Sequence, residues 1–406
     1  MKRSHMLLFG ADSFGLGLII PVMSLVFLTR GATLENLSLC VGVFATAVVV
    51  LELPSGILAD MFGRKRIYLI STLFIMSYYF LLMVSRHFLI LSAACALHGI
   101  GRAFSSGSIE ALEIESYMQE HGKNGLAKIN STMTAVKGCG LSLGSVSGGL
   151  LGYLDPSYTL LLCSAIGLQF FIILLTICCV REPQREKNPL SFSTQFKDQI
   201  RGLTVTLQHS LPVTTIILIM LPFGMLLSTV EIYWQPTLNG FLPSGLSWIF
   251  GIVTCLGYFG NTIGSKAAEF ILKKQGEQLT DRKRWKLYWL SRYLFIIAGA
   301  CLGFIRQTWL FLFLFVLIYI IIGASELIES TVFHSSVANS QRASMMSVQS
   351  LSMRAGGLVT SLVGGLIITR LSFSAIWIIL PLATALSFGA IMFSFYHSSR
   401  VVPAEA

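Results

Sequence analysis

The stretch Gly-Ile-Leu-Ala-Asp-Met-Phe-Gly-Arg-Lys-Arg, residues 56–66, lies between two long apolar runs of the chain. One run ends near Ala59 and the next begins near Ile67. Crossing the hydrocarbon core of a bilayer takes about 20 apolar residues, and both runs reach that length. The stretch is therefore predicted to be a short hydrophilic turn between two membrane spans.

The residue types of this turn fit that position. Gly56 would let a neighbouring helix approach closely, and Gly63 can adopt the positive φ of a tight turn. Asp60, at a helix terminus, can pair with a cation or cap a neighbouring helix. Three basic residues then hold the turn on the cytoplasmic side of the membrane. These are Arg64, Lys65 and Arg66.

This turn resembles the signature loop of the major facilitator superfamily, G-x-L-A-D-x-x-G-R-[KR]-[KR]. The resemblance implies an all-α membrane protein, with twelve transmembrane helices in two pseudo-symmetric six-helix bundles around a central cavity. It implies alternating access driven by an ion gradient, most often of protons, with this loop gating the change of conformation. The matching positions are Gly56, Leu58, Ala59, Asp60, Gly63, Arg64, Lys65 and Arg66.

The composition independently indicates a polytopic membrane protein. Hydrophobic residues make up 54% of the 406 residues and charged residues 12%, about half the charged share of a soluble domain. The net charge of +10 does not indicate nucleic-acid binding, because nearly all the cations fall in alternate loops. The eight cysteines form no C-x-x-C pair, so neither a metal site nor a disulfide framework is expected.

Apolar runs predict twelve spans, and the run after Met1 is taken as the first span rather than a signal peptide. Of the 29 lysines and arginines, 20 lie on the side of the N-terminus and four lie between spans on the other side. This bias predicts that both termini are cytoplasmic. The spans are 5–29, 36–59, 67–85, 88–112, 130–153, 157–180, 212–236, 246–271, 287–305, 308–330, 346–369 and 372–396.

Weak internal similarity predicts two six-span halves, as in many transporters. Residues 265–274 form a degraded copy of the signature turn, without its glycines. The pair Glu326 and Glu329 in span ten repeats the spacing of Glu110 and Glu113 in span four. The expected domains are a bundle over 1–180, a cytoplasmic linker over 181–211 and a bundle over 212–406.

Span five carries a glycine face that permits close helix packing whatever the function. It is similar to the superfamily's exporter motif, G-x-x-x-G-P-x-x-G-G, although Ser145 stands where the family has proline. The resemblance favours antiport, and generic packing of small residues is the alternative. The matching glycines are Gly140, Gly144, Gly148 and Gly149.

Charged residues inside spans are costly and are therefore candidates for proton coupling. Arg102 resembles the arginine of the family's fourth-span motif, which is linked to proton coupling, but could instead form a structural ion pair with Glu110 or Asp12. Asp12 could be helix-end structure, and Glu52 could help to kink its span at Pro54. The coupling candidates are Glu110, Glu326, Asp12, Arg102 and Glu52.

Span seven ends with an acid and two aromatic residues, Glu231, Tyr233 and Trp234. Two interpretations remain open. The aromatic residues could form a belt at the membrane interface, which is favoured. Together with the acid, they could instead line a substrate cavity and bind a cationic ligand.

The sequence thus predicts a secondary active transporter of the cell membrane, a proton-coupled exporter of a lipophilic or cationic small molecule. A metabolite uptake symporter is the alternative, and a non-transporting sensor with the same fold is an alternative of another class. No Walker motif and no cluster of catalytic residues is visible, so an enzyme is not expected and no cofactor is implied. The expected partners are the substrate, protons and the lipid bilayer, and the chain is expected to be a monomer that binds no nucleic acid.

Overall fold

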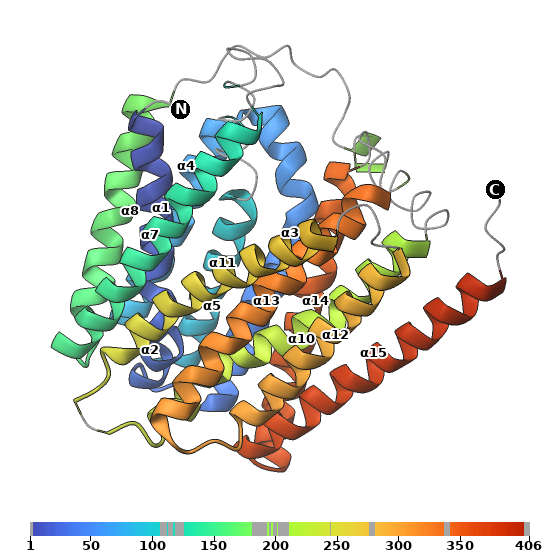
Figure 1. The fold of residues 1–406 in the computed structure, drawn as a ribbon. Coiled ribbons are helices and arrows are strands. Elements are labelled where there is room, and N and C mark those ends of the chain that lie inside the picture. The colour runs from blue at the N-terminus through green and yellow to red at the C-terminus, as the bar shows by residue number, and fades with distance from the viewer. Residues whose placement is uncertain are drawn as a thin grey trace. The chain divides into compact units, whose positions relative to one another are not determined.

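The structure is a computed structural model, and every regular element among the residues it describes is a helix (Figure 1). The predicted all-α class is therefore confirmed. The described residues are 3–105, 112, 117, 126–180, 193, 194, 196, 197, 201, 211–243, 245–275, 281–336 and 342–401.

The chain divides into two units, with helix α11 shared between them. The domain limits expected from the sequence remain a prediction. Unit 1 comprises Met1–Phe196 and Leu242–Tyr258, and unit 2 comprises Lys197–Phe241 and Phe259–Ala406.

The helices of the first part of the chain are α1 (Arg3–Ile19), η1 (Ile20–Val22), α2 (Met23–Thr29), α3 (Leu34–Phe62), α4 (Arg64–Val84), α5 (Phe88–Ser105), α7 (Leu126–Leu154) and α8 (Thr159–Cys179). Those of the second part are α10 (Leu211–Asn239), α11 (Ile249–Gln275), α12 (Asp281–Leu302), α13 (Thr308–Ser336), α14 (Arg342–Arg370), η4 (Phe373–Ala375) and α15 (Ile376–Val401).

Nine helical segments of the described chain are long and apolar enough to cross a membrane, and the first of them, His5–Thr29, runs through α1, η1 and α2. The predicted spans 130–153, 246–271 and 287–305 overlap α7, α11 and α12. These three segments are helical but are less apolar or more highly charged than the nine segments above. The count of twelve spans therefore remains a prediction.

Polar side chains define where two of the helices begin. The Thr33 hydroxyl accepts a hydrogen bond from the Asn36 amide at 3.1 Å and caps α3. Before α8, the Asp155 carboxylate accepts hydrogen bonds from the amides of Leu160 and Ser157 at 2.8 and 2.9 Å. These bonds, the one from Leu160 first, hold the pKa of Asp155 below its usual value because they stabilise the charged form.

Within unit 1, α7 lies directly against the backbone of α1 through three glycines, Gly140, Gly144 and Gly148 (Figure 1). A Cβ added at Gly140 would lie 2.7 Å from a carbonyl oxygen of α1, closer than real Cβ contacts. Each of the three faces one carbonyl, spaced one turn apart along α1. Those carbonyls belong to Gly10, Phe14 and Leu18.

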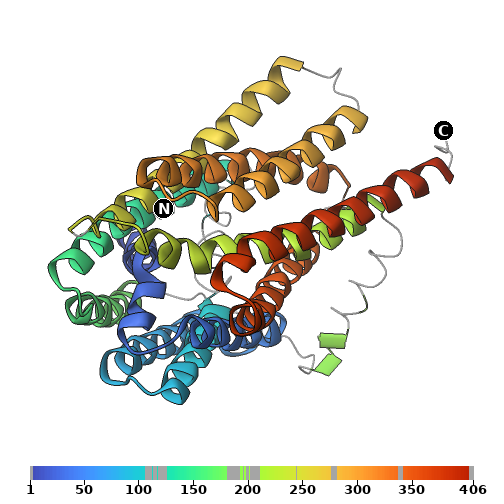
Figure 2. The same cartoon turned by 90° about the horizontal axis from the view of Figure 1, so that it is seen from below.

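Unit 2 contains a matching pair, α10 and α14. Gly224 on α10 and Gly356 on α14 each lie against a backbone carbonyl of the other helix. The Thr360 hydroxyl adds a hydrogen bond to the Met225 carbonyl at 2.6 Å. Beside α10, the last helix α15 packs along its other side, as the red and yellow-green ribbons show in Figure 2. Small residues thus let two long helices of each unit approach backbone to backbone.

Substituting Gly144 by alanine should lower the stability of the protein, because the new methyl group meets the rigid backbone of α1. Overpacking of this kind costs about 1–3 kcal/mol. The matched control is Gly138→Ala, where an added Cβ meets no described atom within 4 Å. Alanine is favoured over glycine in a helix, so this control should be neutral or stabilising.

Thermal unfolding of the purified variants in detergent, followed by circular dichroism, tests this expectation. Equal melting temperatures for Gly144→Ala and Gly138→Ala would contradict the tight α1–α7 contact.

Candidate functional site

The signature turn is a single residue, Gly63, which ends α3 and begins α4. Its φ of +98° confirms the predicted positive φ, a conformation that a side chain would strain. The Gly63 amide donates to the Ala59 carbonyl at 3.1 Å and closes the last turn of α3. The close helix approach expected at Gly56 is absent from the described structure, because a Cβ added there meets no atom within 4 Å.

The charged residues around this turn have different partners. Asp60, which is about half exposed, pairs with Arg64 one turn later at 3.4 Å. The Lys65 ammonium donates to the carbonyls of Ile177 and Val180 at 3.0 and 2.7 Å, at the end of α8. Lys65 thereby satisfies carbonyl groups that have no partner within their own helix. The turn is fixed to two helix ends, whereas Arg66 is exposed.

In unit 1, one group of charges surrounds Asp12 on α1. The Asp12 carboxylate is partly buried and accepts a hydrogen bond from the Tyr68 hydroxyl of α4 at 3.1 Å. Arg102 on α5 and Lys137 on α7 both act on it electrostatically. Four helices thus bring an acid and two cations together, and Asp12 is one of the two partners expected for Arg102. The other, Glu110, lies outside the described residues.

Glu52 is separate from this group. It is partly buried on α3, two residues before Pro54, and its carbonyl accepts a hydrogen bond from the Ser55 hydroxyl at 2.8 Å. Pro54 lies inside the helix, as the expected kink requires.

The aromatic residues that end span seven are buried in unit 2, which corrects their interpretation as an exposed belt at the membrane interface. Trp234 is 3% exposed and packs on Phe315 of α13, with ring centroids 4.3 Å apart. Tyr233 is fully buried and lies edge-on to Phe373 at 5.9 Å. Glu231 is exposed and interacts electrostatically with Arg354 of α14. The shared substrate site of these three residues remains a prediction.

A buried ion pair, Arg292 on α12 with Glu329 on α13, forms the polar centre of unit 2. Glu329 also accepts hydrogen bonds from the Tyr288 hydroxyl, at 2.8 Å, and from the Gln349 amide of α14. The Arg292 guanidinium is fully buried and lies over the Phe223 ring of α10, 3.8 Å from its centroid. Residues from four helices therefore converge on one charge pair.

A cavity of about 290 Å³ lies beside this pair. Its charged lining consists of Arg292, Glu329 and Glu326, and Glu326 is exposed. The Glu326 carboxylate accepts a hydrogen bond from the Asn261 amide of α11 at 3.2 Å. Most of the other lining is sulfur-containing or aromatic. These residues are Met220, Phe223, Phe333, Met346 and Met353.

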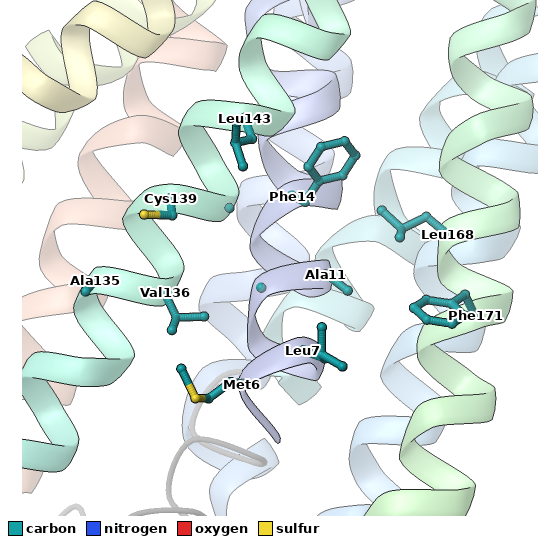
Figure 3. A pocket seen from close by; sticks show the side chains of 12 residues that line it. Met6, Leu7, Ala11, Phe14, Ala135, Val136, Cys139, Leu143, Leu168 and Phe171 are labelled. Carbon is teal, nitrogen blue, oxygen red and sulfur yellow. The ribbon is translucent and has the colours of Figure 1, made fainter. Parts of the chain in front are cut away.

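Unit 1 contains an open groove of a different kind, of about 750 Å³, between α1, α7 and α8 (Figure 3). Figure 3 shows Leu7 and Phe14 of α1, Val136 and Leu143 of α7 and Phe171 of α8 around it. No charged side chain is among the described residues that line the groove. It can hold hydrocarbon but offers nothing to bind or exchange a charge, so the cavity of unit 2 is the stronger candidate for a polar ligand.

The sequence profile of the Major Facilitator Superfamily matches residues 6–275, more than half of the chain. The chain belongs to the major facilitator superfamily. Among curated proteins, the quinolone resistance protein NorA of Staphylococcus aureus is 26% identical over 212 residues, 52% of each protein. The tetracycline resistance protein, class B, of Escherichia coli is 22% identical over 309 residues, 74% of this chain and 71% of that protein. The match to NorA thus spans about half of its length.

Solved structures of transporters share the fold. The nucleoside transporter NupG superposes with a TM-score of 0.74 at 15% identity, covering 97% of this chain and 98% of that one. A bacterial homolog of the human lysosomal transporter Spinster, in an inward-facing and unoccupied conformation, gives 0.72 at 14% identity, covering 98% and 96%. At these identities the likeness shows the fold alone. As a member of this superfamily, the protein is a membrane-spanning transporter, and the family implies no enzymatic activity.

Sequence reasoning missed Arg292, the buried cation of this superfamily member. Glu329, which the sequence marked only by its repeated spacing, is 5% exposed inside unit 2. The signal was present, since Arg292 is a cation inside the apolar run of span nine and an acid follows in span ten. Its depth in the unit could not be read from the sequence, because that depends on helix rotation.

Replacing Arg292 by methionine should destabilise the protein by about 3–5 kcal/mol, because Glu329 would remain as a buried charge without its counter-ion. Replacing both residues by methionine should cost clearly less than the sum of the two single changes. The control is Lys266→Met, which breaks an exposed pair with Glu269 and should change stability by less than about 1 kcal/mol.

Unfolding of the purified variants by titration with a denaturing detergent measures these differences. Additive effects of the two single changes would show that Arg292 and Glu329 are not energetically coupled.

Proposed function

We propose that this protein is a proton-coupled exporter of lipophilic or cationic small molecules in the cell membrane. It would act as a monomer, with both termini in the cytoplasm. The observation that carries the proposal is the cavity of unit 2, which combines an apolar wall with the exposed carboxylate of Glu326. Such a site can bind an apolar body and a positive charge together.

The relatives support the direction of transport. NorA and the class B tetracycline protein are both named for drug resistance, which fits removal of a compound from the cell. The glycine face of α7 agrees with the resemblance to the exporter motif. Gly140, Gly144 and Gly148 face α1, whereas Gly149 faces Gly251 of α11.

Coupling requires a carboxylate whose protonation changes with the conformation. When a cavity opens to water the charged form is stabilised, and when it closes the protonated form is favoured. Glu326 is the residue proposed to meet this requirement in unit 2. In unit 1 the corresponding proposal is Asp12, which lies between a hydroxyl donor and two cations. Glu110 and Glu52 are less favoured candidates for the coupling residue. Arg102 is proposed to stabilise the charged form of the Asp12 carboxylate.

Transport by purified protein in proteoliposomes under an imposed pH gradient tests this function. A panel of 2-phenylethylammonium, a quinolone, tetracycline and a lipophilic cationic dye is offered, and accumulation is measured in both directions. Glu326→Gln or Asp12→Asn should reduce proton-driven accumulation at least tenfold, while gradient-independent exchange persists when the substrate is at saturating concentration. Glu269, which pairs with Lys266 and does not line the cavity, offers the control Glu269→Gln.

Full proton-driven transport in both variants would show that another residue couples transport to protons. If the wild-type protein moves no compound, a sensor that has kept the fold is favoured. If a compound accumulates on the side toward which protons flow, uptake by symport is favoured.

The signature turn is proposed to gate the change of conformation, and Asp60→Asn should therefore slow transport more than it destabilises the protein. The reason is that an exposed ion pair such as Asp60 with Arg64 contributes little to folding but can favour one conformation. Turnover and melting temperature are measured on the same preparation. Normal turnover by Asp60→Asn would indicate that the turn only sets the orientation of the chain in the membrane.

A further inference from the structure

The cavity of unit 2 has a charge distribution that discriminates between ligands. Among the described residues that line it, three are charged, and they sum to one negative charge when all are ionised, because Arg292 and Glu329 neutralise each other. Glu329 already accepts from Arg292, Tyr288 and Gln349, so its carboxylate has little capacity left for a ligand. Glu326 therefore supplies the net charge that a ligand would meet.

Glu326 is also the charged group that is available. It is exposed, and its carboxylate accepts one hydrogen bond, from the neutral amide of Asn261 at 3.2 Å. On α11, which carries Asn261, Lys266 and Glu269 pair with each other at 3.3 Å. An anionic ligand would be repelled by Glu326 and would have to share Arg292, whose charge Glu329 already neutralises. A cation meets neither obstacle.

The walls of the cavity complement an organic cation rather than a bare metal ion. Thioethers and aromatic rings can surround the apolar part of a ligand. An aromatic ring also attracts a cation placed over its face, and a thioether sulfur packs favourably against an aromatic ring of the ligand. Met346 is 50% exposed at the edge of the cavity, and Met220 and Phe223 of α10 close it on another side.

The size of the cavity limits the ligand. Its volume of about 290 Å³ lies at the lower end of the range for small-molecule sites, about 300–1,000 Å³. One aromatic ring with a short arm fills such a space, whereas a fused multi-ring compound exceeds it.

We propose that the cavity among α10, α12, α13 and α14 binds a small organic ammonium ion, with Glu326 as its counter-ion and the methionine and phenylalanine side chains around its hydrocarbon part. The Arg292–Glu329 pair positions this site and does not bind the ligand. The inference rests on the proposed export function, for which it names a substrate class: amines of about one aromatic ring.

Isothermal titration of the full-length protein in detergent with 2-phenylethylammonium tests the proposal. One ion should bind per chain, and Glu326→Gln should weaken binding at least tenfold, because a charge-assisted hydrogen bond is replaced by a neutral one. The matched control Glu269→Gln removes the same charge from an acid that does not line the cavity, and should leave the affinity within about twofold. Phenylacetate has the same shape but the opposite charge, and should not bind.

A second variant, Met346→Trp, keeps the charge and fills the cavity from a half-exposed position. It should abolish binding while the protein remains monodisperse. Unchanged affinity in Glu326→Gln, or binding of phenylacetate as tight as that of the amine, would overturn the proposal.

The outcome is separable from that of the proposed function. Glu326-dependent binding without transport in proteoliposomes would support this site and refute export. Transport without Glu326-dependent binding would refute this site and leave export standing.

Discussion

Inside a bilayer there is no water to hydrogen-bond a peptide group, and an unsatisfied one costs several kcal/mol. A chain with this composition must therefore satisfy its backbone within helices, and all regular elements of the described structure are helical. The same constraint removes the hydrophobic effect as a force between helices, because lipid is as apolar as leucine. Contacts between helices must then come from close packing and polar groups. The glycines between α1 and α7, and between α10 and α14, supply the first of these.

Polar groups also hold the helices together, and they are concentrated where several helices meet. In unit 2, Arg292, Glu329, Tyr288 and Gln349 join α12, α13 and α14, while Arg292 also lies on Phe223 of α10. In unit 1, Asp12 occupies the corresponding role with Tyr68. Buried charges are expensive, so each is held by a partner, and the arrangement fixes the rotation of the helices that carry them. Glu326, one turn before Glu329, is left facing the cavity. A charge that is not needed for structure can serve for ligand binding or proton exchange.

The signature turn links these packing rules to transport. Gly63 joins α3 to α4 without a loop, and Lys65 attaches that junction to the end of α8. Asp60 and Arg64 form an exposed pair beside it. Such a pair contributes little to stability, and a group of this kind can shift a conformational balance at small cost to the fold. The residue that attaches the turn to α8 is thus different from the pair that is proposed to gate the change of conformation.

The sequence by itself determined the helical class, the family resemblance, the positive φ of Gly63 and the segments that can span a membrane, because each follows from local chemistry or from composition along the chain. It also marked Glu326 and Asp12 as costly intramembrane acids. It did not place Tyr233 and Trp234, which were expected at an interface or beside Glu231 and are buried in unit 2. Nor did it assign a role to Arg292.

Which side of a helix faces its neighbours depends on contacts between residues far apart in the chain. In a nearly uniformly apolar span, the hydrophobic pattern carries almost no record of the rotation of the helix. Only the tertiary structure therefore decided that Glu329 closes an ion pair while Glu326 lines a cavity.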